Sequence, residues 1–273
     1  MGDIDLTRTL PESLEGMIAG GGMIALSFII VMIIVIMKRW KGRIIPMLLG
    51  LVAYLVIVFM IPNLLISALA LIPNIATAFE YNPTTYVIIY SALAAVASLV
   101  AKYMISAMLL ERYERKGDIY MAGIGLGTGD VVLYAMTAIS SYVWCLAIYN
   151  EGLSAAMAGM TEAEMASTYA SIEMLYNSPV IIWILFGLNA VMDMLVQFAL
   201  TNLVYGAVKH QLNSNAYVIS AVITFLSLIS FQLYDGTSII SIMICFAVKV
   251  LVCAATMYYT FRIAAGSIEY SED

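Results

Sequence analysis

Four ionisable side chains lie in stretches of sequence that are otherwise apolar enough to cross a lipid bilayer. They are Lys102, Asp130, Asp193 and Lys249, and their charges sum to zero. A charge at the centre of a membrane helix costs roughly 2.5 to 3.5 kcal/mol on insertion scales unless it meets a partner or water. Lysine and aspartate at such positions can neutralise each other in pairs, line a hydrated cavity or pathway, or exchange protons in catalysis.

Each charge belongs to a polar stripe whose members are three or four residues apart, the spacing of one helix face. The stripes are Ser98, Lys102 and Ser106; Asp130, Tyr134, Thr137 and Ser141; Asn189, Asp193, Gln197 and Thr201; and Ser241, Cys245, Lys249, Cys253 and Thr256. Because hydrocarbon cannot satisfy polar groups, we expect all four faces to point into the protein.

The depth of each charge in its span predicts how the charges pair. Lys102 and Asp130 lie nearer one end of their spans, whereas Asp193 and Lys249 both lie near mid-membrane. We therefore predict that Lys102 pairs with Asp130 and that Asp193 pairs with Lys249. The predicted buried charge network comprises Lys102, Asp130, Asp193, Gln197 and Lys249. Its simplest role is to fix the register of the helices.

A run of glycines immediately precedes Asp130. Gly123, Gly125, Gly127 and Gly129 form two overlapping repeats in which small residues are four positions apart. Such repeats let the backbone of another membrane helix approach closely. We predict a tight helix contact at this level of the bilayer.

The composition sets the fold class. Hydrophobic residues make up 63% of the 273 positions and charged residues only 11%, against about 25% charged in an ordinary soluble domain. We predict an all-α, polytopic membrane helix bundle that forms a single transmembrane domain over residues 1–273. A window of about 20 residues, which crosses the hydrocarbon core, gives about seven spans. They are 17–37, 44–72, 85–110, 119–149, 179–208, 215–234 and 237–261.

Basic residues predict the orientation of the spans. Nine of the twelve lysines and arginines follow the first, third, fifth and seventh spans, and only Arg8 falls on the other side. The positive-inside rule then places the N-terminus outside and the C-terminus in the cytoplasm. We expect a multi-pass protein of the cell membrane whose partner is the lipid bilayer. The chain has no basic, aromatic-rich patch, so we expect no nucleic-acid partner.

Residues 151–178 form the one substantial segment outside the predicted spans. Thr161 and Glu164 have the spacing of a capping box, and apolar residues follow at helical intervals up to Asn177. We predict an amphipathic helix on the outer face. A helix that packs over the mouth of the bundle is the simpler interpretation, and a gating lid or a partner site is the alternative.

Two motifs resemble a known family. The loop Glu111-Arg112-Tyr113-Glu114-Arg115-Lys116 and the stretch Gly123-Ile124-Gly125-Leu126-Gly127-Thr128-Gly129-Asp130 are similar to those of the YhfC-type intramembrane peptidases. These peptidases are relatives of the CAAX-processing CPBP proteases and of the anterior-pharynx-defective subunit of gamma-secretase. The resemblance implies a helical membrane peptidase fold.

The motifs that carry catalysis in that family are degenerate here. Its Glu-Glu-x-x-x-Arg motif matches Ser98-Leu99-Val100-Ala101-Lys102, which lacks both carboxylates. In its Gly-x-Gly-His-Gly-x-x-Glu motif, Leu126 replaces the histidine and Asp130 the glutamate, and a later histidine corresponds to Gln197. The resemblance therefore implies a pseudoenzyme that acts as a membrane binding or scaffold subunit, with another membrane protein as its partner. We expect no metal and no cofactor, and we interpret the single histidine, His210, as an interfacial residue.

Two other functions stay open. Gly127-Thr128-Gly129-Asp130 matches the Gly-x-Gly-Asp signature of intramembrane aspartyl proteases, in which Asp193 would be the second catalytic carboxylate. Alternatively, Lys102, Asp130, Asp193 and Lys249 could line a route for ions or a small polar solute.

Overall fold

The computed structural model describes residues 10–113, 115–232 and 238–270. Within these ranges every regular element is a helix, which confirms the all-α prediction. In chain order the helices are α1 (Leu14–Trp40), α2 (Ile44–Ala53), η1 (Tyr54–Met60), α3 (Ile61–Leu69), α4 (Pro73–Tyr81), α5 (Pro83–Arg112), α6 (Lys116–Glu151), α7 (Leu153–Ala156), α8 (Glu162–Asn177), α9 (Ile182–Val208), α10 (Asn215–Gln232), α11 (Ile239–Tyr258), η2 (Tyr259–Ala264) and η3 (Ala265–Ser267). Arg8 and positions 233 and 234 of the sixth predicted span lie outside the described residues.

Six helical segments of the described chain are long and apolar enough to cross a bilayer, as a multi-pass integral membrane protein requires. They are Leu14–Trp40, Ile44–Leu69, Pro83–Leu110, Lys116–Glu151, Ile182–Val208 and Ile239–Arg262. The remaining predicted span coincides with α10, whose apolar part, Asn215–Ser230, is shorter than the about 20 residues that cross the hydrocarbon core. Which terminus faces the cytoplasm stays a prediction.

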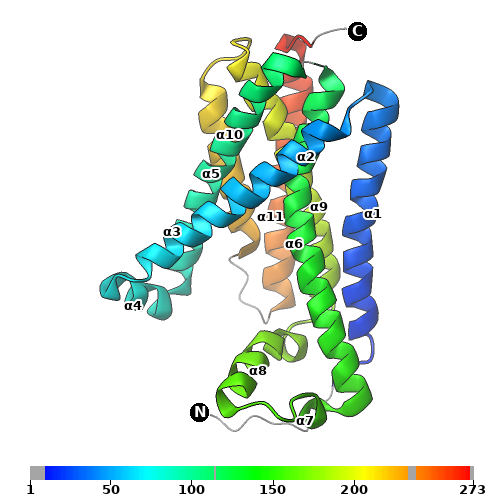
Figure 1. The fold of residues 1–273 in the computed structure, drawn as a ribbon, viewed down its shortest axis with the longest axis vertical. Helices are drawn as coiled ribbons and strands as arrows, with labels where there is room; N and C mark the ends of the chain where they lie inside the picture. The colour runs from blue at the N-terminus through cyan, green and yellow to red at the C-terminus, as the bar shows by residue number, and fades with distance from the viewer. Residues whose placement is uncertain (1–9, 114, 233–237, 271–273) are drawn as a thin grey trace.

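The central helix of the bundle is α9. In its apolar window 67% of the residues are buried, against 22% in the corresponding windows of α1 and α11. It packs against α1, α5, α6, α10 and α11, as Figure 1 shows for the α6 side. Because protein surrounds α9, the polar stripe that it carries is shielded from lipid.

The second membrane segment, Ile44–Leu69, changes its hydrogen-bond pattern in the middle. There η1 forms seven residues of π-helix, and Pro62 follows in the first turn of α3. Proline lacks an N–H group, and its ring clashes with the carbonyl four residues earlier in a regular helix. The wider π turn accommodates that carbonyl, and such turns are frequent at functional sites.

The first glycine repeat of α6 packs against α9. A Cβ atom on Gly123 would lie 2.9 Å from the Cα of Phe198, and one on Gly127 would lie 2.4 Å from the Cα of Met194. Both distances are too short for any side chain larger than hydrogen, so the backbones of α6 and α9 are in close contact.

The second glycine repeat packs against a different neighbour, because residues two apart on a helix point in nearly opposite directions. A Cβ atom on Gly125 would lie 2.0 Å from the carbonyl oxygen of Met47 in α2. One on Gly129 would lie 1.9 Å from the ring of Tyr54 in η1. The glycine run therefore allows α6 to pack closely against α9 on one side and against α2 and η1 on the other.

An ion pair that the sequence analysis did not foresee joins the turn between α1 and α2 to the start of α6. Asp118 is fully buried, and its Oδ1 accepts hydrogen bonds from the Arg43 backbone N–H at 2.9 Å and Nε at 3.1 Å. The Arg43 guanidinium also lies 4.5 Å from the centre of the Tyr113 ring. Arg43 therefore joins the turn between α1 and α2 to the start of α6, and it is also one of the basic residues that predict the orientation of the spans.

Helices α7 and α8 lie at the end of the bundle where α6 terminates (Figure 1). The predicted capping box at the start of α8 is present: the Thr161 backbone N–H donates to Glu164 Oε2 at 2.8 Å, and the Glu164 N–H donates to Thr161 Oγ1 at 3.3 Å. The backbone hydrogen bond from Thr161 lowers the pKa of Glu164.

The glycine contacts generate a stability prediction. We expect Gly127→Ala to lower the free energy of unfolding by about 1–3 kcal/mol, because the new methyl group overpacks the contact with α9. Gly16 in α1 is the matched control, since a Cβ there would meet no atom within 4 Å. Gly16→Ala should be neutral or stabilising. Thermal unfolding in mild detergent measures both, and equal stability of the two variants would contradict the packing account.

Candidate functional site

Lys249 and Asp193 form a buried ion pair in the membrane region. The Lys249 ammonium, which is fully buried, donates to Asp193 Oδ1 and to the carbonyl oxygen of Ser227, at 2.6 Å for the latter. Ser227 Oγ donates to the same Asp193 oxygen at 3.0 Å, and Asn189 Nδ2 donates to Asp193 Oδ2 at 3.0 Å. The structure thus forms the ion pair expected from membrane depth, and supplements it with hydrogen bonds.

The other predicted pair is not formed. Lys102 on α5 donates to Ser98 Oγ at 2.5 Å and, at 3.5 Å, to Thr224 Oγ1 on α10. Ser98 in turn donates to Gln197 Oε1 at 3.1 Å. Among the described ion pairs none joins Lys102 to Asp130, so this prediction was wrong. Depth along the membrane does not fix the direction in which a side chain points, and the Lys102 face of α5 meets α9 and α10.

Asp130 is held by a tyrosine instead of a lysine. The Tyr54 hydroxyl donates to Asp130 Oδ1 at 2.5 Å. The ring of Tyr54 rests where Gly129 has no side chain, and the π turn of η1 begins at Tyr54. The second carboxylate oxygen, Asp130 Oδ2, is buried and has no hydrogen-bond partner.

A polar cavity of about 200 Å³ lies between α6, α9, α10 and α11. It is lined by Asp130, Tyr134, Phe186, Asn189, Ala190, Asp193, Leu228 and Lys249. Three of the predicted site residues, Asp130, Asp193 and Lys249, therefore share one cavity. Lys102 and Gln197 are not part of its lining; they belong to the separate hydrogen-bonded group with Ser98.

One predicted polar face does not point fully inward. Thr137, on the same stripe as Asp130, is exposed on the outside of α6. Its hydroxyl donates to the carbonyl oxygen of Leu133 at 3.1 Å. Threonine can satisfy its polar group on its own helix in this way, so a hydroxyl alone does not require an inward orientation.

The sequence analysis missed three partners of the charged residues: Tyr54, Thr224 and Ser227. Thr224 and Ser227 belong to a buried stripe on α10 that also includes Ser220 and Ser230. The spacing of three and four residues is present in the sequence. The sequence analysis considered only stripes that contain a charged residue, and this stripe contains none. Tyr54 lies on an every-fourth buried stripe with Pro46 and Gly50, but this stripe is mostly apolar and did not mark Tyr54 as a partner of a charge.

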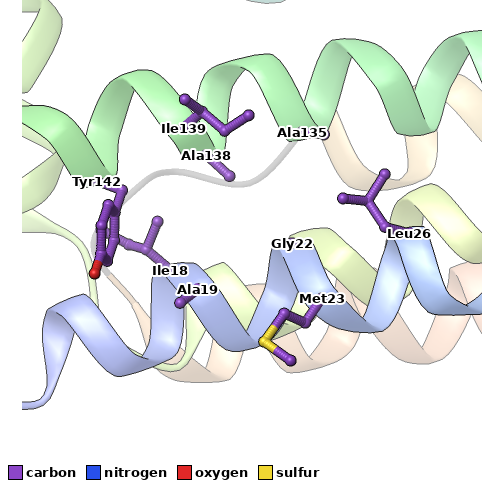
Figure 2. Close-up of a pocket in the computed structure, with 9 residues that line it drawn as sticks. All are labelled: Ile18, Ala19, Gly22, Met23, Leu26, Ala135, Ala138, Ile139 and Tyr142. Atoms are coloured by element: carbon purple, nitrogen blue, oxygen red, sulfur yellow. The ribbon is translucent and has the colours of Figure 1, made fainter.

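A second cavity is apolar and lies between α1 and α6 (Figure 2). Its volume is about 240 Å³, and small residues such as Ala19, Gly22 and Ala138 leave the space. Tyr142 stands at one end, where its hydroxyl donates to Glu15 at 2.8 Å. The cavity offers no acid, base or free amide to a substrate, so we place the functional site at the polar cavity.

The Asp193–Lys249 pair yields a double-variant test. Lys249→Met should destabilise the protein by about 3–5 kcal/mol, because it leaves a buried carboxylate without its counter-ion. Combining it with Asp193→Leu should cost less than the sum of the two single losses. Lys102→Met and Asp130→Asn provide the control, and their losses should add. Additive losses for the first pair, measured by thermal unfolding, would contradict the assignment of the ion pair.

Comparison with known protein families matches residues 22–252, which is most of the chain, to the YhfC intramembrane metalloprotease family. Comparisons with curated proteins and with solved structures found no match. The match spans the helices that hold the polar cavity and the glycine run. It agrees with the resemblance in the loop before α6 and in the glycine-rich stretch. The chain belongs to the YhfC intramembrane metalloprotease family.

Proposed function

We propose that this chain is a non-catalytic member of its family that serves as a binding or scaffold subunit in the membrane. One observation carries the proposal. The positions that the resemblance assigns to the catalytic set hold a closed hydrogen-bonded group of Ser98, Lys102 and Gln197. All three residues are buried.

This group lacks the carboxylates and the imidazole that the family's motifs would supply to activate water, and its one ionisable side chain, Lys102, donates a hydrogen bond to Ser98. Ser98 Oγ accepts from the Lys102 ammonium and donates to Gln197 Oε1, so its hydroxyl is already committed. Glutamine has no usable proton equilibrium, and the group contains no carboxylate or imidazole to act as a general base. Leu126, at the position of the family's histidine, is 1% exposed and packs in an apolar cluster with Ala101 and Ile105.

The residues of the polar cavity do not fit a catalytic metal ion either. In the described part of the chain, no three histidine, cysteine, aspartate or glutamate side chains gather closely enough to hold one. Of the two cavity aspartates, Asp193 is already neutralised by the Lys249 ammonium, whose positive charge would oppose a divalent cation. His210, the single histidine of the chain, follows the end of α9 and is not part of the cavity lining.

One observation favours a second candidate, an intramembrane aspartyl protease. Asp130 and Asp193 line the same cavity, and two carboxylates that share one proton are the catalytic unit of that class. The Lys249 ammonium opposes this function, because its bond to Asp193 Oδ1 removes the need to share a proton. A test that removes each carboxylate separates the two candidates.

We predict that Asp130→Asn and Asp193→Asn leave the membrane-protein cleavage products of cells unchanged. The measurement is mass spectrometry of protein N-termini in membranes that contain the wild-type chain or either variant at equal abundance. Thr137→Val, an exposed change on the same helix as Asp130, controls for expression. Cleavage products that disappear in both aspartate variants and persist in Thr137→Val would establish the aspartyl protease.

A scaffold should remain bound to its partner when it is purified. We predict that the chain, isolated from its native membranes in mild detergent, carries another membrane protein in fixed stoichiometry. We also predict that it retains no stoichiometric zinc, because the side chains that could bind zinc form an incomplete set of ligands. Native mass spectrometry and elemental analysis measure both quantities. A chain that is isolated alone with one tightly bound zinc ion would overturn the proposal.

A further inference from the structure

The charges that line the polar cavity do not cancel. Lys249 neutralises Asp193 through a direct ion pair. Asp130, on the facing helix, has the neutral Tyr54 hydroxyl as its partner. With Asp130 ionised, the cavity has one excess negative charge. A buried carboxylate without a counter-ion costs several kcal/mol in a bilayer, on the order of the insertion cost of a charge.

Two buried oxygen atoms of the lining residues lack a hydrogen-bond donor: Asp130 Oδ2 and Asn189 Oδ1. The orientation of the Asn189 amide follows from its partner, because only the NH₂ group can donate to Asp193 Oδ2. Its Oδ1 is therefore a true acceptor. An acceptor that is buried and unpaired destabilises the folded chain, so a donor that reaches it is bound favourably.

The neighbouring hydroxyl groups cannot supply the missing protons. Tyr54 donates to the other oxygen of Asp130, at 2.5 Å. Tyr134, which also lines the cavity, donates to the carbonyl oxygen of Trp183 at 2.7 Å. A bound cation with its own N–H groups would supply both the missing positive charge and the missing donors.

We propose that this cavity binds a primary ammonium group, which donates hydrogen bonds to Asp130 Oδ2 and Asn189 Oδ1 when the two side chains rotate to turn these buried oxygens toward the cavity. Hard metal ions such as Ca²⁺ require six or more oxygen ligands, which two free acceptors do not provide. An ammonium group has three donors and forms strong charge-assisted bonds to a carboxylate. Phe186, Ala190 and Leu228 give the cavity an apolar side, which suits the short alkyl chain of a small amine or of a lysine side chain.

The inference goes beyond the scaffold role, because it applies whether or not the chain binds a protein partner. The direct test is equilibrium dialysis of the purified chain in mild detergent against radiolabelled methylammonium at neutral pH. We expect saturable binding that unlabelled methylammonium displaces, whereas tetramethylammonium, which has no N–H group, and Na⁺ do not. Thermal unfolding should show the same selectivity as an increase in Tm.

Three variants locate the site. Asp130→Asn and Asn189→Leu should each weaken methylammonium binding by about tenfold or more, since each removes a bond to the charged group. Thr137→Val should bind like the wild type. If Asn189→Leu does not fold, Asn189→Ser replaces it, and the shorter side chain, which cannot place an amide oxygen in the cavity, should also weaken binding. Circular dichroism establishes that each variant is folded before it is tested.

A second experiment distinguishes the two possible sources of the ammonium group, a lysine of a partner helix and a soluble amine. A synthetic leucine helix with one central lysine should associate with the wild type, but not with Asp130→Asn, if the group comes from a partner helix. Binding of methylammonium alone assigns the site to a soluble amine. The proposal would be overturned if methylammonium did not bind, or if tetramethylammonium or Na⁺ displaced it equally well. It would also be overturned if the infrared spectrum showed a protonated Asp130 carboxyl that methylammonium leaves unchanged.

Discussion

The bilayer provides no hydrogen bonds, and this constraint organises the molecule around α9. A helix that carries Asn189, Asp193 and Gln197 cannot face hydrocarbon, so it occupies the centre of the bundle with α1, α5, α6, α10 and α11 around it. Asn189 donates to Asp193 on α9 itself, and the other two residues bond to neighbouring helices. Gln197 meets α5, and Asp193 meets both α10 and α11.

Close packing of α6 makes these contacts possible. Its glycines allow the α9 backbone to approach on one side and α2 and η1 on the other. The same arrangement brings Tyr54 to Asp130 on one face of α6 and leaves the polar cavity toward α9. Of the positions that the resemblance matches to the family's catalytic motifs, Ser98, Lys102 and Gln197 form a hydrogen-bonded group and Leu126 packs in an apolar cluster, whereas Asp130 lines the polar cavity. The chain thus belongs to the family, and its residues at these positions differ from the motifs to which the resemblance matches them.

Much of this architecture could be predicted from patterns that report one helix at a time. Hydropathy gave the membrane helices, and stripes of period three to four gave the buried faces of α5, α9 and α11. The Asp193–Lys249 pair could be predicted because both residues lie near mid-membrane. Lys102 and Asp130 could not be assigned in this way, because their partners depend on how helices are rotated about their axes. Tyr54 lies on a buried face with a spacing of four residues, but that spacing does not show which residue of α6 its hydroxyl meets.

The order of Asp193 and Lys249 along the chain has a consequence for biosynthesis. Asp193 precedes the lysine that neutralises it by 56 residues, and α10 lies between them. During synthesis α9 therefore reaches the membrane while its counter-ion is still on the ribosome or in its exit tunnel. Until α11 arrives, the carboxylate must be protonated, hydrated, or held by the insertion machinery. Neutralisation of Asp193 is thus coupled to the emergence of α11, and a chain truncated before Lys249 would expose this unpaired acid to cellular quality control.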